Sequence, residues 1–403
     1  MKRRNFLQAA IAGGIAATTA RSAFGDSSMT TGKGTLKTDV VVFGAGSFGA
    51  WTAYQLQKDG MSVVLADVNG AGNTMGAAGG HTRTMRAQYG TRVAYARLAM
   101  RAAELWRNHE KEWKEQLMLP CERVRIWPPS RLEEAKAEQK LLAGMGVDMR
   151  ILPAEEARKH WPQFVIQDEE IVIHTSGMDG KHPASASIML ASKSGGVVVR
   201  EFQRLGGKFL QAGATAPASS GRVGNLELSG GEKVSAGQFV FACGHQLAEL
   251  FPSLMEKRAE VQRRFEYYVE PPAGSSEYSH PQMPMWGFNT PDWYGYPSIE
   301  GIGVKVSHVY TDARVDEAMA FVKRRFPGLT PKLKSMRVCH DLYTPSTDFI
   351  VDRHPEHDNV WIAGGGSGHG FKHGPALGEH VAAKLTGGKV DAELDALCRW
   401  KSV

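Results

Sequence analysis

Apolar runs and helix-period segments alternate near the start of the chain. Residues 39–43 form a short apolar run rich in valine, residues 50–58 have helical composition, and residues 62–66 form a second apolar run. Runs of this length with β-branched residues are typical of buried strands, so the order predicts a strand, a helix and a strand. From residue 92 to 116, apolar and aromatic side chains recur at spacings of three and four, which predicts a long helix.

Two later segments have patterns of their own. Ser130 followed by Glu133 matches a capping box and predicts a helix that ends near Ala143. Nine aromatic residues fall between Phe265 and Tyr296 among prolines and glycines, which favours antiparallel strands joined by turns.

The charge balance and the cysteines exclude two classes of protein. The formal net charge is +6, but Lys2, Arg3, Arg4 and Arg21 lie in the first 25 residues, which hold no acid. Subtracting these four charges from +6 leaves +2 for the rest of the chain, so a nucleic-acid-binding surface of clustered cations has little support. The four cysteines form no CxxC pair, and so few in 403 residues cannot build a disulfide framework.

The N-terminal segment has the pattern of an export signal. The motif KRRNFL at residues 2–7 precedes a weakly apolar run to Ala20 and a small-residue stretch that ends at Gly25. This pattern predicts a twin-arginine signal peptide over residues 1–25, hence a periplasmic protein carried by the twin-arginine export machinery. The run is shorter than the roughly 20 apolar residues of a spanning helix, so we expect no integral membrane segment in the mature protein. Residues 26–37, rich in Ser, Thr, Gly and Lys, are predicted to be a linker.

A glycine-rich turn joins the first predicted strand to the first helix. Gly44, Gly46 and Gly49 form the pattern GxGxxG, Ser47 lies within it, and Asp67 closes the second strand. The glycines suit a tight turn, a close approach to a pyrophosphate, and packing of helix on strand, while the acid can bind a ribose. The motif predicts dinucleotide binding but does not distinguish FAD from NAD. A turn without a ligand is the alternative.

Three further segments occur in a fixed order along the chain. They are residues 82–90 (TRTMRAQYG), residues 294–305 (YGYPSIEGIGVK) and residues 349–372, which contain HPEH and SGHGFK. Together they resemble monomeric sarcosine oxidase and its relatives, a family of the D-amino-acid-oxidase superfamily of flavoproteins. The resemblance extends from about residue 38 to 390 and implies FAD as the cofactor.

The resemblance also implies a fold and a reaction. We expect an α/β (mixed α+β) protein. A Rossmann-like FAD-binding domain is assembled from residues 38–120, 175–255 and 335–403, and a substrate domain with an antiparallel sheet comprises residues 121–174 and 256–334. The implied reaction oxidises the C–N bond of an amino acid or N-alkyl amino acid. Hydride passes to flavin N5, water hydrolyses the imine, and oxygen is reduced to hydrogen peroxide.

Residues of this chain match the family's site one by one. Arg86 and Lys372 match the two cations that hold the substrate carboxylate, and Tyr294 matches a residue near it. Arg83 and Lys305 match cations over the flavin, the lysine being associated with the oxygen reaction, where positive charge stabilises developing superoxide. The other expected cofactor contacts are Thr82, Gly244, Gly366, Gly368, His369 and Gly370. Surface ion pairs, an outward-facing strand lysine and a core tyrosine are the alternative interpretations.

Cys339 stands ten residues before Phe349. At this spacing the resembled enzymes carry the cysteine that binds the flavin 8α-methyl group, so the resemblance implies covalent FAD, with a buried inert cysteine as the alternative. Two positions depart from the family. Val309 replaces a histidine, with His308 displaced by one, and His81 replaces an aspartate. We therefore expect a substrate other than sarcosine.

Several interpretations of the function remain open. The nearest alternative is a periplasmic amino-acid dehydrogenase that passes electrons to a respiratory acceptor rather than to oxygen. An exported protein that binds flavin without turnover is a second, and an NAD-dependent dehydrogenase is the poorest. The spacing of His354, His357, His369 and His373 raises the possibility of a metal site, but no carboxylate or thiolate pattern completes one, so no metal is predicted.

Overall fold

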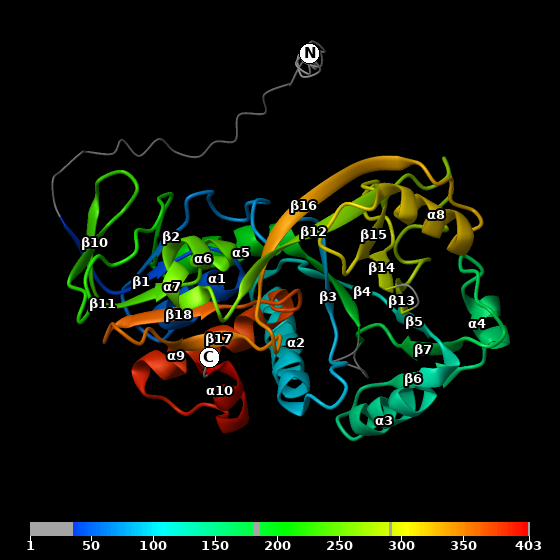
Figure 1. The fold of residues 1–403 in the computed structure, drawn as a ribbon, viewed down its shortest axis with the longest axis horizontal. Helices are drawn as coiled ribbons and strands as arrows, with labels where there is room; N and C mark the ends of the chain where they lie inside the picture. The colour runs from blue at the N-terminus through cyan, green and yellow to red at the C-terminus, as the bar shows by residue number, and fades with distance from the viewer. Residues whose placement is uncertain (1–34, 180–185, 290–291, 402–403) are drawn as a thin grey trace, which may run out of the picture. The chain divides into compact units, whose positions relative to one another are not determined.

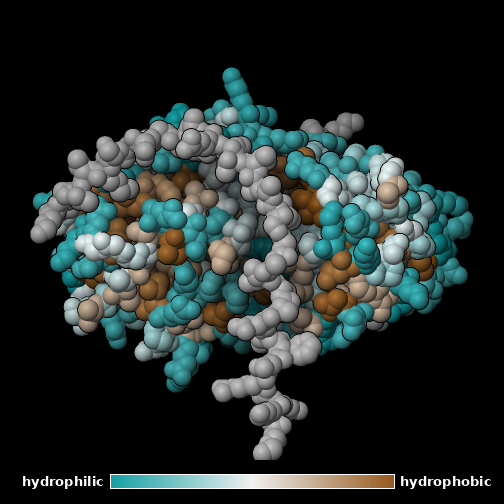
Figure 2. Space-filling model, turned by 90° about the horizontal axis from the view of Figure 1, so that it is seen from above, coloured by the Kyte–Doolittle hydropathy of each residue, from teal (hydrophilic) through white to brown (hydrophobic). Residues whose placement is uncertain are grey.

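The structure is a computed structural model that describes residues 35–179, 186–289 and 292–401. The predicted signal peptide and all but the last three residues of the predicted linker lie outside the described residues. Residues from Thr35 onward form one compact unit. Within the described ranges, no helix has both the length and the apolar character needed to cross a membrane. On the face seen in Figure 2, hydrophilic atoms predominate and hydrophobic atoms show in separate patches.

A seven-stranded sheet carries the first part of the fold. Its order is β17-β18-β11-β1-β2-β9, and β10 pairs with β11. The strands from β18 to β9 run parallel, whereas β17 and β10 are antiparallel to their neighbours. The bounds are β1 (Leu36–Phe43), β2 (Val63–Ala66), β9 (Lys208–Leu210), β10 (Asn225–Glu227), β11 (Lys233–Phe241), β17 (Ile350–Arg353) and β18 (Val360–Gly364). The last four residues of β1 and all of β2 are buried, as expected for parallel strands covered on both faces.

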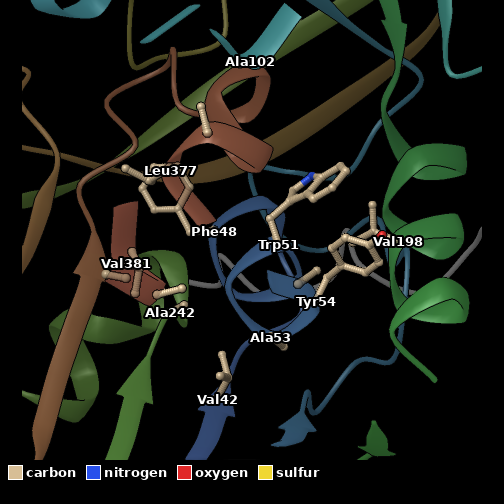
Figure 3. Close-up of a cluster of buried hydrophobic side chains, with 14 of the residues drawn as sticks. Val42, Phe48, Trp51, Ala53, Tyr54, Ala102, Val198, Ala242, Leu377 and Val381 are labelled. Carbon is tan, nitrogen blue, oxygen red and sulfur yellow. The ribbon is translucent and has the colours of Figure 1, made fainter. Parts of the chain in front are cut away.

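Helix α1 (Ser47–Lys58) packs between α9 (Gly374–Thr386) and α5 (Ala191–Arg204). Figure 3 shows Phe48 of α1 beside Leu377 of α9, and Tyr54 on the side of Val198 of α5. The contact with α9 is close because that helix presents glycines. A Cβ atom at Gly374 would lie 2.3 Å from Trp51 Cδ1, and one at Gly378 would lie 2.6 Å from Trp51 O. Helix α2 (Val93–Trp113) contacts the same core, where the Trp51 and Trp106 rings pack edge to face.

An eight-stranded sheet forms the second part, and Figure 1 shows its long strands β12 and β16 running side by side toward helix α8 (Val315–Arg325). All neighbours pair antiparallel except β13 with β5. In spatial order the strands are β16 (Leu333–Tyr343), β12 (Glu260–Val269), β15 (Val304–His308), β14 (Asp292–Tyr296), β13 (Met285–Asn289), β5 (Arg123–Trp127), β7 (Ile171–Thr175) and β6 (Met149–Leu152).

A three-stranded sheet and several short helices complete the described fold. The sheet consists of β3 (Thr82–Met85), β8 (Ser187–Leu190) and β4 (Met118–Pro120). The α-helices not yet placed are α3 (Leu132–Ala143), α4 (Ala154–His160), α6 (Leu247–Leu250), α7 (Pro252–Met255) and α10 (Ala392–Cys398). The 3₁₀ turns are η1 (Pro129–Arg131), η2 (Gly244–Gln246) and η3 (Phe371–His373).

The structure confirms the mixed α/β class and the predicted strand, helix and strand at the start of the fold. The predicted capping box is wrong, because α3 begins at Leu132 and its N-cap position is Arg131, which makes no side-chain cap hydrogen bond. Pro129 instead starts the 3₁₀ turn η1, which its fixed φ favours. Strand β1 begins at Leu36, so the end of the predicted linker is part of a strand. The predicted FAD-binding domain includes residues 335–403, but β16 at the start of this range pairs in the eight-stranded sheet of the second part.

Candidate functional site

Three glycine-bearing turns meet at one edge of the seven-stranded sheet. They follow β1, β11 and β18, which run parallel, so Gly44, Gly244 and Gly366 lie beyond the carboxyl ends of the strands. In α/β sheets this edge is where ligands bind. The three glycines line a single cavity of about 720 Å³, within the range of small-molecule and cofactor sites.

The first turn leaves its backbone open to a ligand. Gly44 has φ +94°, and a Cβ atom there would lie 2.4 Å from Ala242 O. At Gly49 a Cβ atom would lie 1.8 Å from Gly44 O, so this glycine serves packing and does not line the cavity. At Gly46 a Cβ atom would approach only Ala78 Cβ, at 3.8 Å, and the residue lines the cavity. The turn thus fits the pyrophosphate of a dinucleotide at the N-terminus of α1.

The other cofactor residues surround this turn. Ser47 Oγ donates to Phe371 O at 2.7 Å, which ties the first turn to the third. Asp67 Oδ2 accepts a hydrogen bond from Ala45 N at 2.7 Å, and Asp67 lines the cavity with acceptor capacity left for a ribose.

We expect Gly46→Val to lose bound flavin while leaving the fold intact. Gly46 has φ −69°, which any residue adopts, so the new side chain would cost no backbone strain and would project into the cofactor space. Overpacking typically costs about 1–3 kcal/mol, so the non-covalent affinity for flavin, which precedes any covalent attachment, should weaken roughly 10- to 100-fold. The ratio of flavin absorbance to protein measures the loss. The melting temperature of the variant without flavin should match that of the parent protein without flavin. Gly224→Val, at a glycine with open space outside the cavity, is the control.

The third turn, after β18, is held by a carboxylate that the sequence analysis missed. Gly368 N donates to Asp341 Oδ2 at 2.6 Å, and Gly370 N donates to Gly366 O at 2.9 Å. Burial raises the pKa of the Asp341 carboxyl. His369 lines the cavity, with its Nε2 2.9 Å from Thr347 O. The cavity is lined by all four predicted residues of this turn, which are Gly366, Gly368, His369 and Gly370.

Lys305 and Arg83 meet at a second carboxylate that the sequence analysis missed. Lys305 Nζ lies 2.7 Å from Glu266 Oε1, and Arg83 Nη1 lies 3.1 Å from the same oxygen. Arg337 Nη1 lies 3.4 Å from Glu266 Oε2. Lys305 is only 3% exposed and lines the cavity, so the alternative of an outward-facing strand lysine is wrong.

Burial and the neighbouring charges shift the pKa values of Lys305, Glu266 and Arg83. Burial lowers the pKa of Lys305 to about 8, although the Glu266 carboxylate opposes the shift. Burial alone would raise the pKa of Glu266, but Lys305, Arg83 and Arg337 outweigh it and hold that pKa far below its ordinary value. Burial would lower the pKa of Arg83, and Glu266 reverses the shift and raises it. Positive charge at Lys305 is therefore present below about pH 8 and declines above it.

The residues predicted to bind the substrate carboxylate lie at the same cavity. Lys372 is buried, and its Nζ donates to Tyr89 Oη at 2.8 Å and to His369 O at 2.7 Å. The Arg86 guanidinium lies over the Tyr89 ring at 4.6 Å and donates to Gln88 O. Neither cation contacts a carboxylate of the described residues, so the alternative of surface ion pairs is wrong for both.

Tyr294 also faces the cavity, which excludes the core interpretation for it. Its side chain is 39% exposed, it lines the cavity, and its Oη lies 3.3 Å from Ser307 Oγ. Thr82 does not line the cavity; its carbonyl oxygen accepts hydrogen bonds from Arg83 Nη1 and Lys305 Nζ at 2.7 and 3.4 Å. Thr82 is a predicted cofactor contact, but in the structure its carbonyl oxygen holds the two cations in place.

The two departures from the family and Cys339 can also be placed. His81 is exposed and does not line the cavity. Cys339 is buried on β16, where it pairs with Arg264, and it lines the cavity. Val309 lines the cavity too, whereas His308 is fully buried and contacts Tyr267 Oη with its Nε2 at 3.0 Å. The displaced histidine therefore does not reach the site.

Comparison with known proteins identifies the family of the chain. The chain matches the DAO family, described as FAD dependent oxidoreductase, over residues 39–384. It is 26% identical to monomeric sarcosine oxidase of Bacillus sp. (strain B-0618), covering 88% of this chain and 94% of that protein. It is 25% identical to N-methyl-L-tryptophan oxidase of Yersinia pestis (strain Pestoides F), covering 90% and 99%. The crystal structure of L-proline dehydrogenase from P. horikoshii shares the fold, with a TM-score of 0.75, 18% identity and coverage of 90% and 96%.

Proposed function

The chain belongs to the DAO family of FAD-dependent oxidoreductases, and on this premise we propose that it oxidises the C–N bond of an amino acid or N-alkyl amino acid and reduces oxygen to hydrogen peroxide. One observation carries the proposal. A single cavity is lined both by the glycine turns that fit a dinucleotide and by Arg86, Lys372 and Lys305. A carboxylated amine bound by these cations would share the cavity with the bound flavin.

The chain's own residues would bind and orient the substrate. Arg86 and Lys372 would bind its carboxylate through charge-assisted hydrogen bonds, and the Tyr89 hydroxyl holds the ammonium of Lys372 in place. These contacts would hold the reacting C–H bond in one orientation, and such positioning lowers the activation barrier of the reaction. When bound, FAD would supply the two-electron acceptor that takes hydride from the carbon next to nitrogen. Tyr294, on the cavity wall, would pack against the carboxylate side of the substrate.

Lys305 and Glu266 support oxygen as the electron acceptor. A buried ammonium that faces the cavity would stabilise negative charge as it develops on oxygen. Glu266 would keep Lys305 charged and fixed, since its Oε1 is 2.7 Å from Nζ. A respiratory acceptor is the competing candidate.

The first experiment is anaerobic mixing of the purified yellow protein with N-methyl and primary amino acids. The proposal requires that at least one of them bleaches the flavin, and that air restores the colour with release of hydrogen peroxide. Bleaching that is reversed by a quinone analogue but not by air would replace the oxidase with a dehydrogenase. Failure of every amine to bleach the flavin would leave a flavin-binding protein without turnover.

We also propose that FAD is attached to Cys339, which faces the cavity from β16. After acid precipitation we expect the yellow colour in the pellet for the parent protein and in the supernatant for Cys339→Ser. Cys243→Ser is the matched control, because Cys243 lines the same cavity on the seven-stranded-sheet side. Colour in the supernatant of the parent protein, or in the pellet of Cys339→Ser, would assign Cys339 to packing alone.

Export through the twin-arginine route is proposed from residues 1–25, which precede the folded unit. With Arg3 and Arg4 both changed to Lys, we expect the protein to stay in the cytoplasm, folded and yellow, because this route reads the arginine pair. Fractionation of cells with a flavin assay measures this, and Lys2→Arg serves as the control. Undiminished periplasmic protein in the double variant would refute the route.

A further inference from the structure

The cavity contains an arginine that the proposed reaction does not use. Arg123, the first residue of β5, lines the cavity and is only partly exposed. Its Nη1 is buried without a hydrogen-bond partner, and no ion pair is formed by its guanidinium with any residue the structure describes. An arginine stays protonated in proteins, so this is a positive charge without an ion-pair partner among the described residues.

Strand pairing places Arg123 beside the residues that hold Arg86. Arg123 is directly opposite Thr175 in the antiparallel pair of β5 and β7, and opposite side chains stand on the same face of a sheet. Thr175 Oγ1 accepts a hydrogen bond from Gln88 Nε2 at 2.8 Å, and Gln88 O accepts one from Arg86. Arg123 and Arg86 thus approach the cavity from adjoining walls.

The cations repel one another across this space. Burial lowers the pKa of Arg123 well below its ordinary value, Arg125 and Arg86 lower it further, and Glu138 opposes the shift only in part. Burial likewise lowers the pKa of Lys372, with added repulsion from Arg86 and Arg123. These shifts agree with the geometry, in which Arg86, Arg123 and Lys372 line the same cavity.

Most other cations of the cavity already have carboxylate partners. Arg83 and Lys305 share Glu266, and Arg125 Nη2 lies 2.5 Å from Glu138 Oε2. The cavity's remaining carboxylates are engaged elsewhere or exposed: Asp67 binds Ala45 N, Asp341 binds Gly368 N, and Asp292 is exposed. Four cations of the cavity, Arg86, Lys372, Arg123 and Arg264, form no ion pair with the described residues. Arg264 instead donates hydrogen bonds to Tyr343 Oη at 3.1 Å and to Gln262 Oε1 at 2.5 Å.

We propose that Arg123 binds a second anionic group of the substrate, so that the enzyme acts on an amino acid or N-alkyl amino acid with two carboxylates. The inference rests on the proposed amine oxidation. One carboxylate would occupy Arg86 and Lys372, as proposed above, and would leave the buried charge of Arg123 uncompensated. A second carboxylate removes this penalty, because burying an unpaired charge is costly while a paired and hydrogen-bonded one is tolerated.

The test compares substrates that differ only in the second carboxylate. Sarcosine is paired with iminodiacetate, and N-methyl-alanine with N-methyl-aspartate in both configurations, in anaerobic flavin reduction. We expect the parent protein to prefer the dicarboxylate of each pair. Arg123→Gln should lower kcat/KM for dicarboxylates by roughly 10- to 100-fold, the effect of one charge-assisted hydrogen bond, with little change for monocarboxylates. Arg123→Lys should restore part of the preference.

Equilibrium binding separates the anion site from the chemistry. Calorimetry of the flavin-loaded protein should show glutarate binding more tightly than butyrate, with the difference abolished by Arg123→Gln. Arg131→Gln is the matched control, because Arg131 pairs with Glu134 at 2.5 Å and does not line the cavity. Control and parent should behave alike.

Three outcomes decide the inference. It is overturned if the parent protein does not prefer dicarboxylates, or if Arg123→Gln changes flavin retention, which would assign Arg123 to the cofactor. If no amine bleaches the flavin but glutarate still binds through Arg123, the second-anion site stands and the proposed amine oxidation fails.

Discussion

Lys305→Met should slow the reaction of the substrate-reduced enzyme with oxygen by about 100-fold or more, while substrate still bleaches the flavin at nearly the parent rate. The expectation follows from the position of the ammonium, which is buried, faces the cavity and is held by Glu266. Removing one preorganised group that stabilises developing charge typically costs about 10²–10³ in rate. Stopped-flow measurement of the two half-reactions separates oxygen reduction from amine oxidation.

The pH dependence of the oxygen reaction has a defined sign. The pKa of Lys305 is lowered to about 8, so the charge is present below that pH and is lost as the pH rises through it. The charged groups around it are Arg83 from β3, Glu266 from β12 and Arg337 from β16, and the Tyr296 ring lies 4.9 Å away. Glu266, whose pKa is held far below its ordinary value, and Arg83, whose pKa is raised, keep their charges across this range. Reoxidation by oxygen should therefore decline above about pH 8, and Lys305→Met should remove that decline.

Two results would contradict this role. Equal oxygen rates in Lys305→Met and the parent protein would exclude Lys305 from oxygen activation. A parallel loss of both half-reactions would indicate that the substitution disturbs the cavity, and Lys334→Met, which removes an exposed lysine on β16, controls for loss of a lysine as such.

Arg86→Gln should lower kcat/KM for carboxylated amines by roughly 10²- to 10⁴-fold. A guanidinium can donate two hydrogen bonds to one carboxylate, and hydrogen bonds to charged groups contribute about 1.5–3 kcal/mol each. Because Arg86 contacts no carboxylate of the described residues, its removal should cost substrate binding more than stability. Anaerobic flavin reduction at a series of substrate concentrations gives kcat/KM, and the melting temperature reports on the fold.

An amine without a carboxylate is the internal control for Arg86. Its slow oxidation should be the same in Arg86→Gln and in the parent protein, because the lost contact exists only for the carboxylate. Equal losses for both kinds of amine would place Arg86 in the structure of the cavity rather than in substrate binding.

The sequence alone determined the nucleotide end of the site. Gly44, Gly46, Gly49 and Asp67 are close in sequence, and each is required by a local feature: a turn, a helix N-terminus or a strand end. The resemblance added Arg83, Arg86, Lys305 and Lys372, all of which the structure brings to one cavity. The capping box failed because a local proline turn overrode a two-residue pattern.

Only the tertiary structure decided which charges are compensated. Glu266 lies on β12 and its partners Arg83, Lys305 and Arg337 come from three other strands, so no local pattern marks it as their counterion. Arg123 reads in sequence as an ordinary strand arginine. That its guanidinium forms no ion pair with any residue the structure describes becomes visible only when β5, β7 and the segment after β3 are assembled around the cavity. Coulombic interaction depends on distance in space, and the chain order of these residues does not specify that distance.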